Sequence, residues 1–363
     1  MTSVGAMLPA MRAPRPFACL LLTGLLAAAA SSACNANTVC KVGGPINDAS
    51  NWTLRRSLMS FGLGQFCQQM TTRSAPLKLS PDAPVTGRFY PQHCTQQMLD
   101  NGDLWIQFDG IGYAFTPLSR KVSFTSSATI QYNQDFRCAA DNAIFAYFDT
   151  RTVSRPDFRI VQIEQPVANL MQNWIAPFAE SFGQQMVTGE LGKGFTVIQG
   201  DDNSTDFDVG HLPVGTRPVH PFNLHGDNRI TADSQRTQVY SGERDFIGPI
   251  NVQDNGRALY VTMQLDGQQA VDVFVVPKGE GDASLQLYVN YGQVGPLAYP
   301  PRFTDVVRAG AQYQRAVPVP PGMYYVVIDN TTSAGQVAPS VLPFAVAESP
   351  ANVNYAIQIG DAK

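Results

Sequence analysis

Hydrophobic residues repeat along this chain with two different periods. Two stretches place apolar residues every three to four positions, which is the spacing of one helix face. They cover residues 51–70 and 166–191, and Pro166 at the start of the second suits a first helical turn. The pattern therefore predicts two amphipathic helices.

Between residues 87 and 164 apolar and polar residues alternate instead. Alternation places successive side chains on opposite faces of a β-strand. The predicted strands are 103–108, 113–115, 128–132, 143–148 and 158–163. Short connections without intervening helices indicate an antiparallel meander. Residues 51–210 are accordingly predicted to form an α+β domain, an antiparallel sheet plus two helices.

A second β-rich region follows residues 211–236, whose prolines and glycines indicate a linker. The predicted strands after it are 246–252, 258–265, 270–276, 284–291, 312–319, 323–328, 344–347 and 353–359. Many short strands with turns between them are typical of an antiparallel β-sandwich, here over residues 237–363. The predicted fold class is mostly β with some α, in two domains.

One run in this second region resembles a known family. Residues 319–330, Val-Pro-Pro-Gly-Met-Tyr-Tyr-Val-Val-Ile-Asp-Asn, are similar to a run near the end of the bacterial pre-peptidase C-terminal type of β-sandwich. The resemblance covers about the C-terminal third of the chain. It implies an accessory module of an exported protein rather than a catalyst.

Composition and charge narrow the function classes. Hydrophobic residues make up 44% of the 363 residues and charged residues 15%, so the chain has enough apolar surface to fold and too little charge for disorder. The formal net charge is −4. Nucleic acid is an improbable partner, because binding it requires a clustered positive field.

The first 33 residues have the pattern of a secretory signal peptide. Arg12 and Arg15 precede an apolar segment over residues 20–30, and the small residues 31–33 follow it. The segment contains no acidic residue, so its removal makes the net charge of the chain more negative than −4. The sequence therefore predicts export from the cytoplasm.

Five cysteines remain outside this segment, and an odd number in an exported chain points to one thiol with a separate fate. Cys34 stands at the expected cleavage point, where the run 31–34 resembles a bacterial lipobox but carries Ser31 in place of a large aliphatic residue. We expect a lipid on Cys34, with residues 34–50 as a tether. The alternative is ordinary cleavage, with Cys34 free or paired with Cys40.

The other four cysteines are predicted to form two disulfides, in any of three connectivities. They are Cys40, Cys67, Cys94 and Cys138. Disulfides persist outside the cytoplasm. By resemblance to enterobacterial sorting, Asn35 after the lipidated cysteine favours the outer membrane, and the periplasm is the other expected location.

Candidate chemistry is sparse. Nucleophile-elbow, Walker, dinucleotide and zincin motifs are absent from the sequence, and no cofactor is predicted. Three histidines, His211, His220 and His225, lie close together and could ligate zinc, but a Pro-rich linker with locally bonded histidines is favoured. His93 is interpreted as a loop residue, and the aspartates of 201–208 as a polar hairpin turn rather than a calcium site.

The helix at 166–191 carries Trp174, Phe178 and Phe182, which either fill a core or line a cavity for an apolar ligand. The favoured function is a non-catalytic envelope lipoprotein that acts as a binding or scaffold module. An envelope hydrolase and a carrier of lipid or another apolar ligand are the alternatives. Expected partners are a membrane, through the lipid anchor, and an envelope protein, a glycan or an apolar ligand.

Overall fold

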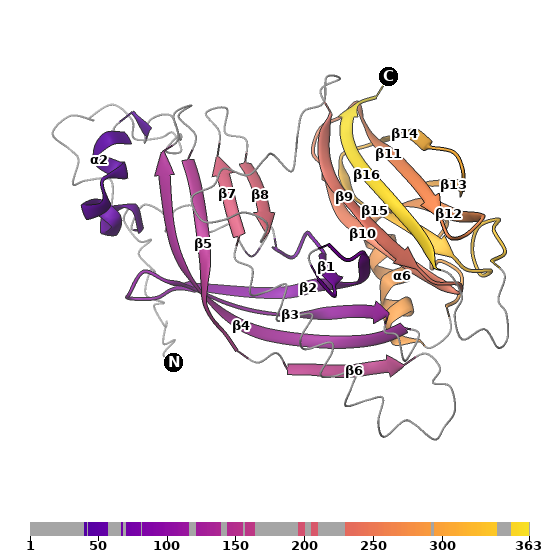
Figure 1. Ribbon diagram of the computed structural model, residues 1–363, viewed down its shortest axis with the longest axis horizontal. Coiled ribbons are helices and arrows are strands. Elements are labelled where there is room, and N and C mark those ends of the chain that lie inside the picture. The colour runs from indigo at the N-terminus through magenta and orange to yellow at the C-terminus, as the bar shows by residue number, and fades with distance from the viewer. Residues whose placement is uncertain are drawn as a thin grey trace, which may run out of the picture.

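The computed structural model describes residues 40–41, 43–56, 67, 70–80, 82–115, 121–138, 144–154, 157–163, 195–199, 205–209, 229–291, 294–339 and 350–362. These residues are mostly β-strand, arranged in two sheets with few helices, which confirms the predicted fold class. Figure 1 shows two units side by side. We call β1 to β8 the first unit and β9 to β16 the sandwich.

Long antiparallel strands build the first unit. They are β1 (Ala75–Lys78), β2 (Val85–Met98), β3 (Leu104–Phe115), β4 (Lys121–Cys138), β5 (Ile144–Val153), β6 (Asp157–Ile163), β7 (Phe195–Gln199) and β8 (Thr205–Val209). Several predicted short strands merge into single strands, since β3 covers both 103–108 and 113–115. The strands β1 and β2 were not predicted, and β7 and β8 pair antiparallel as the expected hairpin.

The sheet of the first unit bends along strand β4. Its first half pairs with β6 and its second half with β5, while β3 pairs with it from Lys121 to Tyr132. Figure 1 shows β4 and β5 turning away from the direction of β2 and β3. Alternate side chains of β4, among them Phe124, are buried in a core with Phe89 and Phe108, and the predicted strand 128–132 lies within β4.

The sandwich packs two antiparallel layers face to face. Its strands are β9 (Ile230–Val239), β10 (Glu243–Val252), β11 (Arg257–Asp266), β12 (Ala270–Pro277), β13 (Phe303–Arg308), β14 (Tyr313–Val319), β15 (Gly322–Asn330) and β16 (Ala351–Asp361). One layer runs in the order β14, β11, β16, β9, and the other in the order β10, β15, β12, β13. Valine and isoleucine side chains fill the space between the layers.

The two units are joined in two ways. The larger sheet continues from the sandwich into the first unit, where Val85 of β2 pairs with Thr237 of β9. A third hydrophobic cluster, which we call the junction core, packs β2 and β3 against the outer face of the four-stranded layer. Its buried members are Tyr90, Ile111, Tyr113, Phe115, Phe246, Phe274, Val276, Leu285, Tyr288, Val289, Tyr325 and Val327.

One segment of the sandwich that was predicted as a strand is a helix in the structure. Residues 284–290 of the predicted strand 284–291 belong to α6 (Lys278–Asn290), which lies against the first unit in Figure 1. The run alternates at Leu285, Leu287 and Val289, which imitates a strand. The structure instead buries Leu285, Tyr288 and Val289 on one helical face and leaves Leu287 43% exposed.

Regular elements lie within both ranges that were predicted as tether and linker. Within 34–50, the structure contains α2 (Gly43–Asn47) and the 3-10 helix η2 (Ala49–Asn51), and residues 52–56 are helical. Within 211–236, residues from Ile230 onward belong to β9, whose backbone pairs along β16. The polar residues of β9 gave no apolar alternation, because this strand is held by backbone pairing and by side-chain hydrogen bonds such as that from Thr237 to Asp245.

Candidate functional site

Both predicted disulfides are present, and the structure selects one of the three connectivities. Cys40 is bonded to Cys138 at the end of β4, and Cys67 is bonded to Cys94 in β2. Each bond therefore joins the N-terminal helical region to the sheet of the first unit. The disulfides indicate a protein that matures outside the reducing cytoplasm.

The other predicted site residues fall mainly outside the described residues. These are Cys34, the three aromatic residues of the 166–191 helix (Trp174, Phe178 and Phe182), and the three linker histidines (His211, His220 and His225). Within the described ranges, no group of three or more His, Cys, Asp or Glu side chains could hold a metal ion. In the same ranges no helix is long and apolar enough to cross a membrane.

His93 is a strand residue rather than a loop residue. It lies in β2 opposite Asp109 of β3, just after a bulge at Pro91. The Nδ1 atom of His93 lies 2.9 Å from Oδ2 of Asp109, and both side chains are more than half exposed. A surface pair of this kind contributes little to stability.

A buried ion pair crosses the boundary between the units. Arg88 of β2 donates to both carboxylate oxygens of Asp245 in β10, over 2.6 and 3.0 Å. Arg88 also donates to the hydroxyl of Tyr355 at 2.9 Å. Asp245 accepts from the hydroxyls of Tyr113 at 2.8 Å and Thr237 at 2.9 Å. Both charged side chains are at most 2% exposed, so their pairing and hydrogen bonds must offset a large desolvation cost.

The protonation states of this network follow from its burial and its partners. Burial lowers the pKa of Arg88, but the charges of Asp245 and Asp233 and the hydrogen bond to Asp245 together outweigh burial and leave that pKa well above its ordinary value. Burial raises the pKa values of Tyr90, Tyr113 and Tyr355 well above their usual range. Arg88 is therefore a fixed cation, and the three tyrosines are neutral hydroxyl groups that can donate hydrogen bonds.

A second buried ion pair lies within the four-stranded layer of the sandwich. Arg244 Nε in β10 donates to Asp329 Oδ1 in β15 over 2.5 Å, and Thr331 donates to the other carboxylate oxygen over 2.9 Å. The backbone N–H of Arg244 donates to the hydroxyl of Tyr288 in α6. Burial, which outweighs the neighbouring Arg244, raises the pKa of Asp329 to about 6.

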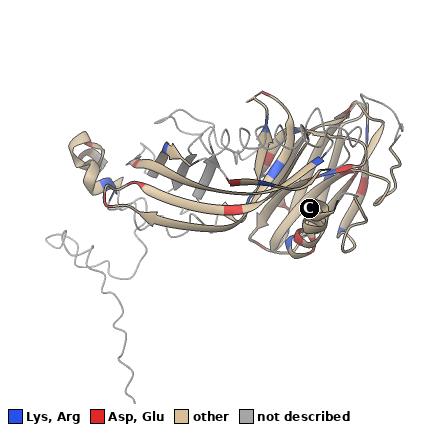
Figure 2. Ribbon diagram, turned by 90° about the horizontal axis from the view of Figure 1, so that it is seen from below, with Lys and Arg blue, Asp and Glu red and all other residues tan. Residues whose placement is uncertain are grey.

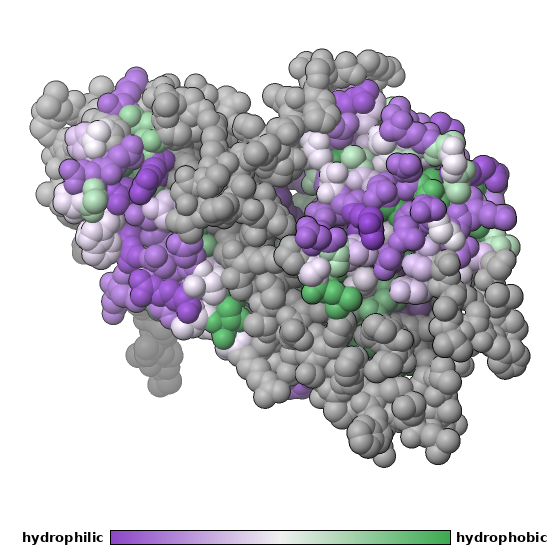
Figure 3. Space-filling view, viewed as in Figure 1, coloured by the Kyte–Doolittle hydropathy of each residue, from purple (hydrophilic) through white to green (hydrophobic). Residues whose placement is uncertain are grey.

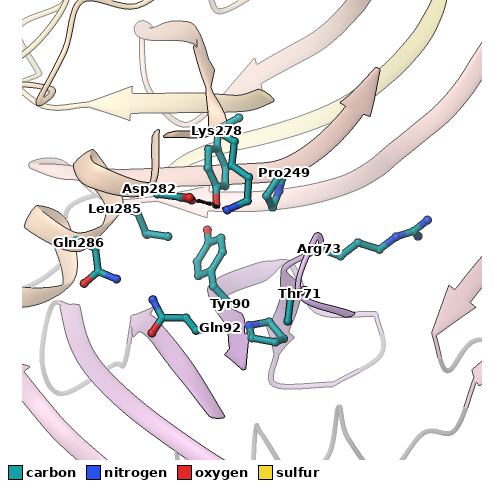
Figure 4. Close-up of a pocket in the computed structure, with 11 residues that line it drawn as sticks. Thr71, Arg73, Tyr90, Gln92, Pro249, Lys278, Asp282, Leu285 and Gln286 are labelled. Carbon is teal, nitrogen blue, oxygen red and sulfur yellow. Dashed lines mark hydrogen bonds and ion pairs between the residues drawn. The ribbon is translucent and has the colours of Figure 1, made fainter. Parts of the chain in front are cut away.

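A pocket of about 350 Å³ opens where the two units meet. Both units contribute to its walls, the first through residues 71–73 and β2 and the sandwich through β10, β15 and α6 (Figure 4). Its lining consists of Thr71, Arg73, Tyr90, Pro91, Gln92, Pro249, Lys278, Asp282, Leu285, Gln286 and Tyr325. This volume is within the range of small-molecule sites.

Hydrogen bonds fix the sandwich side of this pocket. Asp282 accepts from Lys278 Nζ at 2.6 Å and from the hydroxyl of Tyr325 at 2.8 Å. The Tyr90 hydroxyl is bound to the carbonyl oxygen of Phe246. Because Lys278 and Asp282 neutralise each other, the centre of the pocket has little net charge.

The described lining of the pocket offers polar and aromatic groups that can contact a ligand. Gln92 and Gln286 offer amide donors and acceptors, and the rings of Tyr90 and Tyr325 offer apolar surface. In Figure 4 the guanidinium group of Arg73 extends away from the other labelled side chains.

Sequence reasoning missed both the buried pairs and the pocket. Arg88 and Asp245 are 157 positions apart, and neither belongs to a motif. The available signal was weak: Arg88 and Asp245 are charged residues beside apolar strand residues, where an unpaired charge would be costly. Figure 2 shows acidic and basic residues interspersed along the described strands, so charge patterning alone does not mark the site.

Comparisons with known proteins give no family. No family model matches the chain, and no curated protein matches it. A structure of the infectious bursal disease virus Gx strain is 11% identical, with 82% of this chain and 76% of that chain covered and a TM-score of 0.20. Two structures of the Bombyx mori GH32 beta-fructofuranosidase BmSUC1, one a mutant in complex with sucrose, are 8% and 9% identical. They cover 76% and 78% of this chain and 66% and 67% of those chains, each with a TM-score of 0.15. Similarity at this level carries no argument about fold or function.

Proposed function

We propose that this protein is a non-catalytic envelope lipoprotein that binds a neutral polar ligand, such as a glycan fragment, in the pocket between its two units. The observation that carries the proposal is that both units line the pocket while a buried ion pair and an aromatic core join them. Units with a small polar interface move relative to each other, whereas a hydrophobic interface holds them in place. A pocket with fixed walls loses less entropy when it binds a ligand.

The lining favours a neutral hydroxyl- or amide-bearing ligand over an apolar or strongly charged one. The amides of Gln92 and Gln286 can each donate and accept, and Tyr90 and Tyr325 supply ring surface. The paired Lys278 and Asp282 add polar contacts without a net charge. Within the chain's expected surroundings, glycans of the cell envelope have this chemistry.

Calorimetry with a disaccharide of N-acetylglucosamine tests the binding. We expect saturable binding to the full mature chain, weakened at least tenfold by Gln286→Ala, and recovery of the disaccharide intact by mass spectrometry. Gln264→Ala is the matched control, since Gln264 is exposed on β11 in the sandwich. Absence of binding by the unaltered protein, or equal binding by both variants, would rule out this pocket as a glycan site.

We propose further that a lipid on Cys34 holds the protein at the outer membrane. The signal-like segment, the position of Cys34 and the pairing of the other four cysteines support this. Intact mass of the mature protein, with and without reduction, is the test. An acyl-modified Cys34 and a reduction shift for two disulfides are expected, and an unmodified Cys34 would end the lipoprotein proposal.

A further inference from the structure

We infer that the end of the first unit that carries α2 faces the lipid bilayer, with Trp52 and Leu54 in contact with the membrane interface. This inference rests on the proposed lipid at Cys34 and adds the orientation of the protein. Its starting point is the disulfide between Cys40 and Cys138, which fixes the chain to the end of β4. Cys40 is only six positions along the chain from the anchor at Cys34.

The length of this connection limits how far the body can lie from the membrane. Six residues span at most about 20 Å when fully extended. By comparison, the 18 residues of β4 follow a path of about 60 Å from Cys138 back to Lys121 near the junction. The α2 end is therefore the part of the body that a lipidated Cys34 holds at the bilayer.

Several contacts make this end rigid. The side-chain amide of Asn47 donates to the carbonyl oxygen of Cys138 at 3.0 Å, and the N–H of Cys138 donates back to Asn47 at 2.9 Å. Arg55 binds both carboxylate oxygens of Asp135 in β4 and the carbonyl oxygen of Ile46. The disulfide, this side-chain pair and Arg55 together hold residues 43–56 against β4, so its surface has a fixed orientation.

This surface exposes two large hydrophobic side chains. Trp52 is 47% exposed and Leu54 is 45% exposed. The guanidinium carbon of Arg56 lies 4.7 Å from the centroid of the Trp52 ring, and Arg56 itself donates to the carbonyl oxygen of Asn101 at 2.6 Å. In Figure 3 pale green residues lie among hydrophilic ones at the end where Figure 1 places α2.

Bilayer chemistry matches these residues. Tryptophan is enriched at membrane interfaces because its ring is apolar and its N–H is polar. A single Trp and Leu give weak membrane affinity alone. A short lipidated connection raises their effective concentration at the bilayer, so weak contacts become occupied.

Quenching of tryptophan fluorescence by brominated acyl chains tests the inference. The lipidated full-length protein is reconstituted into phosphatidylcholine vesicles with and without brominated phosphatidylcholine. We expect quenching of the unaltered protein, loss of most of that quenching in Trp52→Phe, and a smaller loss in Leu54→Ser. Leu79→Ser is the matched control, because Leu79 is 54% exposed just after β1.

Intact mass of each sample separates the two proposals. Acylated protein whose quenching is unchanged by Trp52→Phe would overturn the orientation and leave the anchor standing. A mass that shows unmodified Cys34 would overturn the anchor and the orientation together. Equal loss of quenching in Leu79→Ser and Leu54→Ser would also overturn the assignment of this face.

Discussion

The two faces of the four-stranded layer in the sandwich are built from different chemistry. The inner face packs Val273, Val275 and Ile328 into an aliphatic core. The outer face packs Phe274 and Tyr325 into the junction core, where polar hydroxyls and buried charges accompany the rings. The stability of the inner face depends on how well aliphatic side chains fill the space. The stability of the outer face depends also on every buried polar group having a hydrogen-bond partner.

This difference predicts which substitutions the molecule tolerates. The inner face can exchange one aliphatic side chain for another at the cost of a small cavity. At the junction, a change of one atom can leave a buried donor, acceptor or charge without a partner. The following predictions test that contrast, starting with the largest expected effect.

Breaking the buried ion pair should have the largest effect. Asp245→Ala removes the carboxylate that binds Arg88 and leaves the guanidinium buried. We expect the free energy of unfolding to fall by about 3–5 kcal/mol, measured by urea denaturation. The double variant Arg88→Met with Asp245→Leu should recover much of this loss. A loss below 1 kcal/mol in the single variant would show that the pair is not a required part of the junction.

Asp329 should give the junction side a pH dependence that the aliphatic side lacks. Burial raises its pKa from 3.8 to about 6 in the folded protein, so the folded state holds a proton that the unfolded state releases. Protonation of Asp329 therefore stabilises the folded state fully below pH 4, and this stabilisation is lost as the pH rises through 6. The free energy of unfolding should fall by about 2–3 kcal/mol across this interval. Unfolding between pH 4 and 7 should show this slope in the unaltered protein and lose it in Asp329→Asn. An identical slope in both would contradict the assignment.

Removing one hydroxyl at the junction should cost more than its size suggests. The Tyr113 hydroxyl donates to Asp245 and accepts from the N–H of Phe246 at 2.9 Å. Tyr113→Phe keeps the ring but leaves both buried partners short of a hydrogen bond, so we expect a loss of about 1–3 kcal/mol by chemical denaturation. Tyr260→Phe serves as control, because its hydroxyl donates to the carbonyl oxygen of the exposed Asp361. Equal losses would remove the distinction between the sites.

The smallest effect is expected on the aliphatic face. Ile328 is fully buried in the sandwich core, and Ile328→Val removes one methylene group. We expect a loss of about 0.5–1.5 kcal/mol, with no change in the pH dependence of unfolding. A loss equal to that of Asp245→Ala would mean that the two faces are equally intolerant, and the comparison would fail.

Much of the architecture could be predicted because alternation of apolar residues is a local property. The strand at 128–132, which lies within β4, and the hairpin of β7 and β8 followed from it, and the oxidised cysteines followed from the export pattern. Strands β10, β12 and β15 were also found, although their local pattern did not show that both faces are covered. Strands buried on both faces often read as continuous apolar runs, but polar residues such as Asp272 interrupt these strands.

The sequence by itself determined the strand-rich class, the four paired cysteines and the period of each buried face, because these depend on residues near one another in the chain or on composition. Only the tertiary structure decided that α6 is a helix and that Arg88 meets Asp245. The same holds for the pocket between the units and for the bond of Cys40 to Cys138. These features depend on contacts between distant segments, and local patterns carry no information about which distant partner a side chain finds.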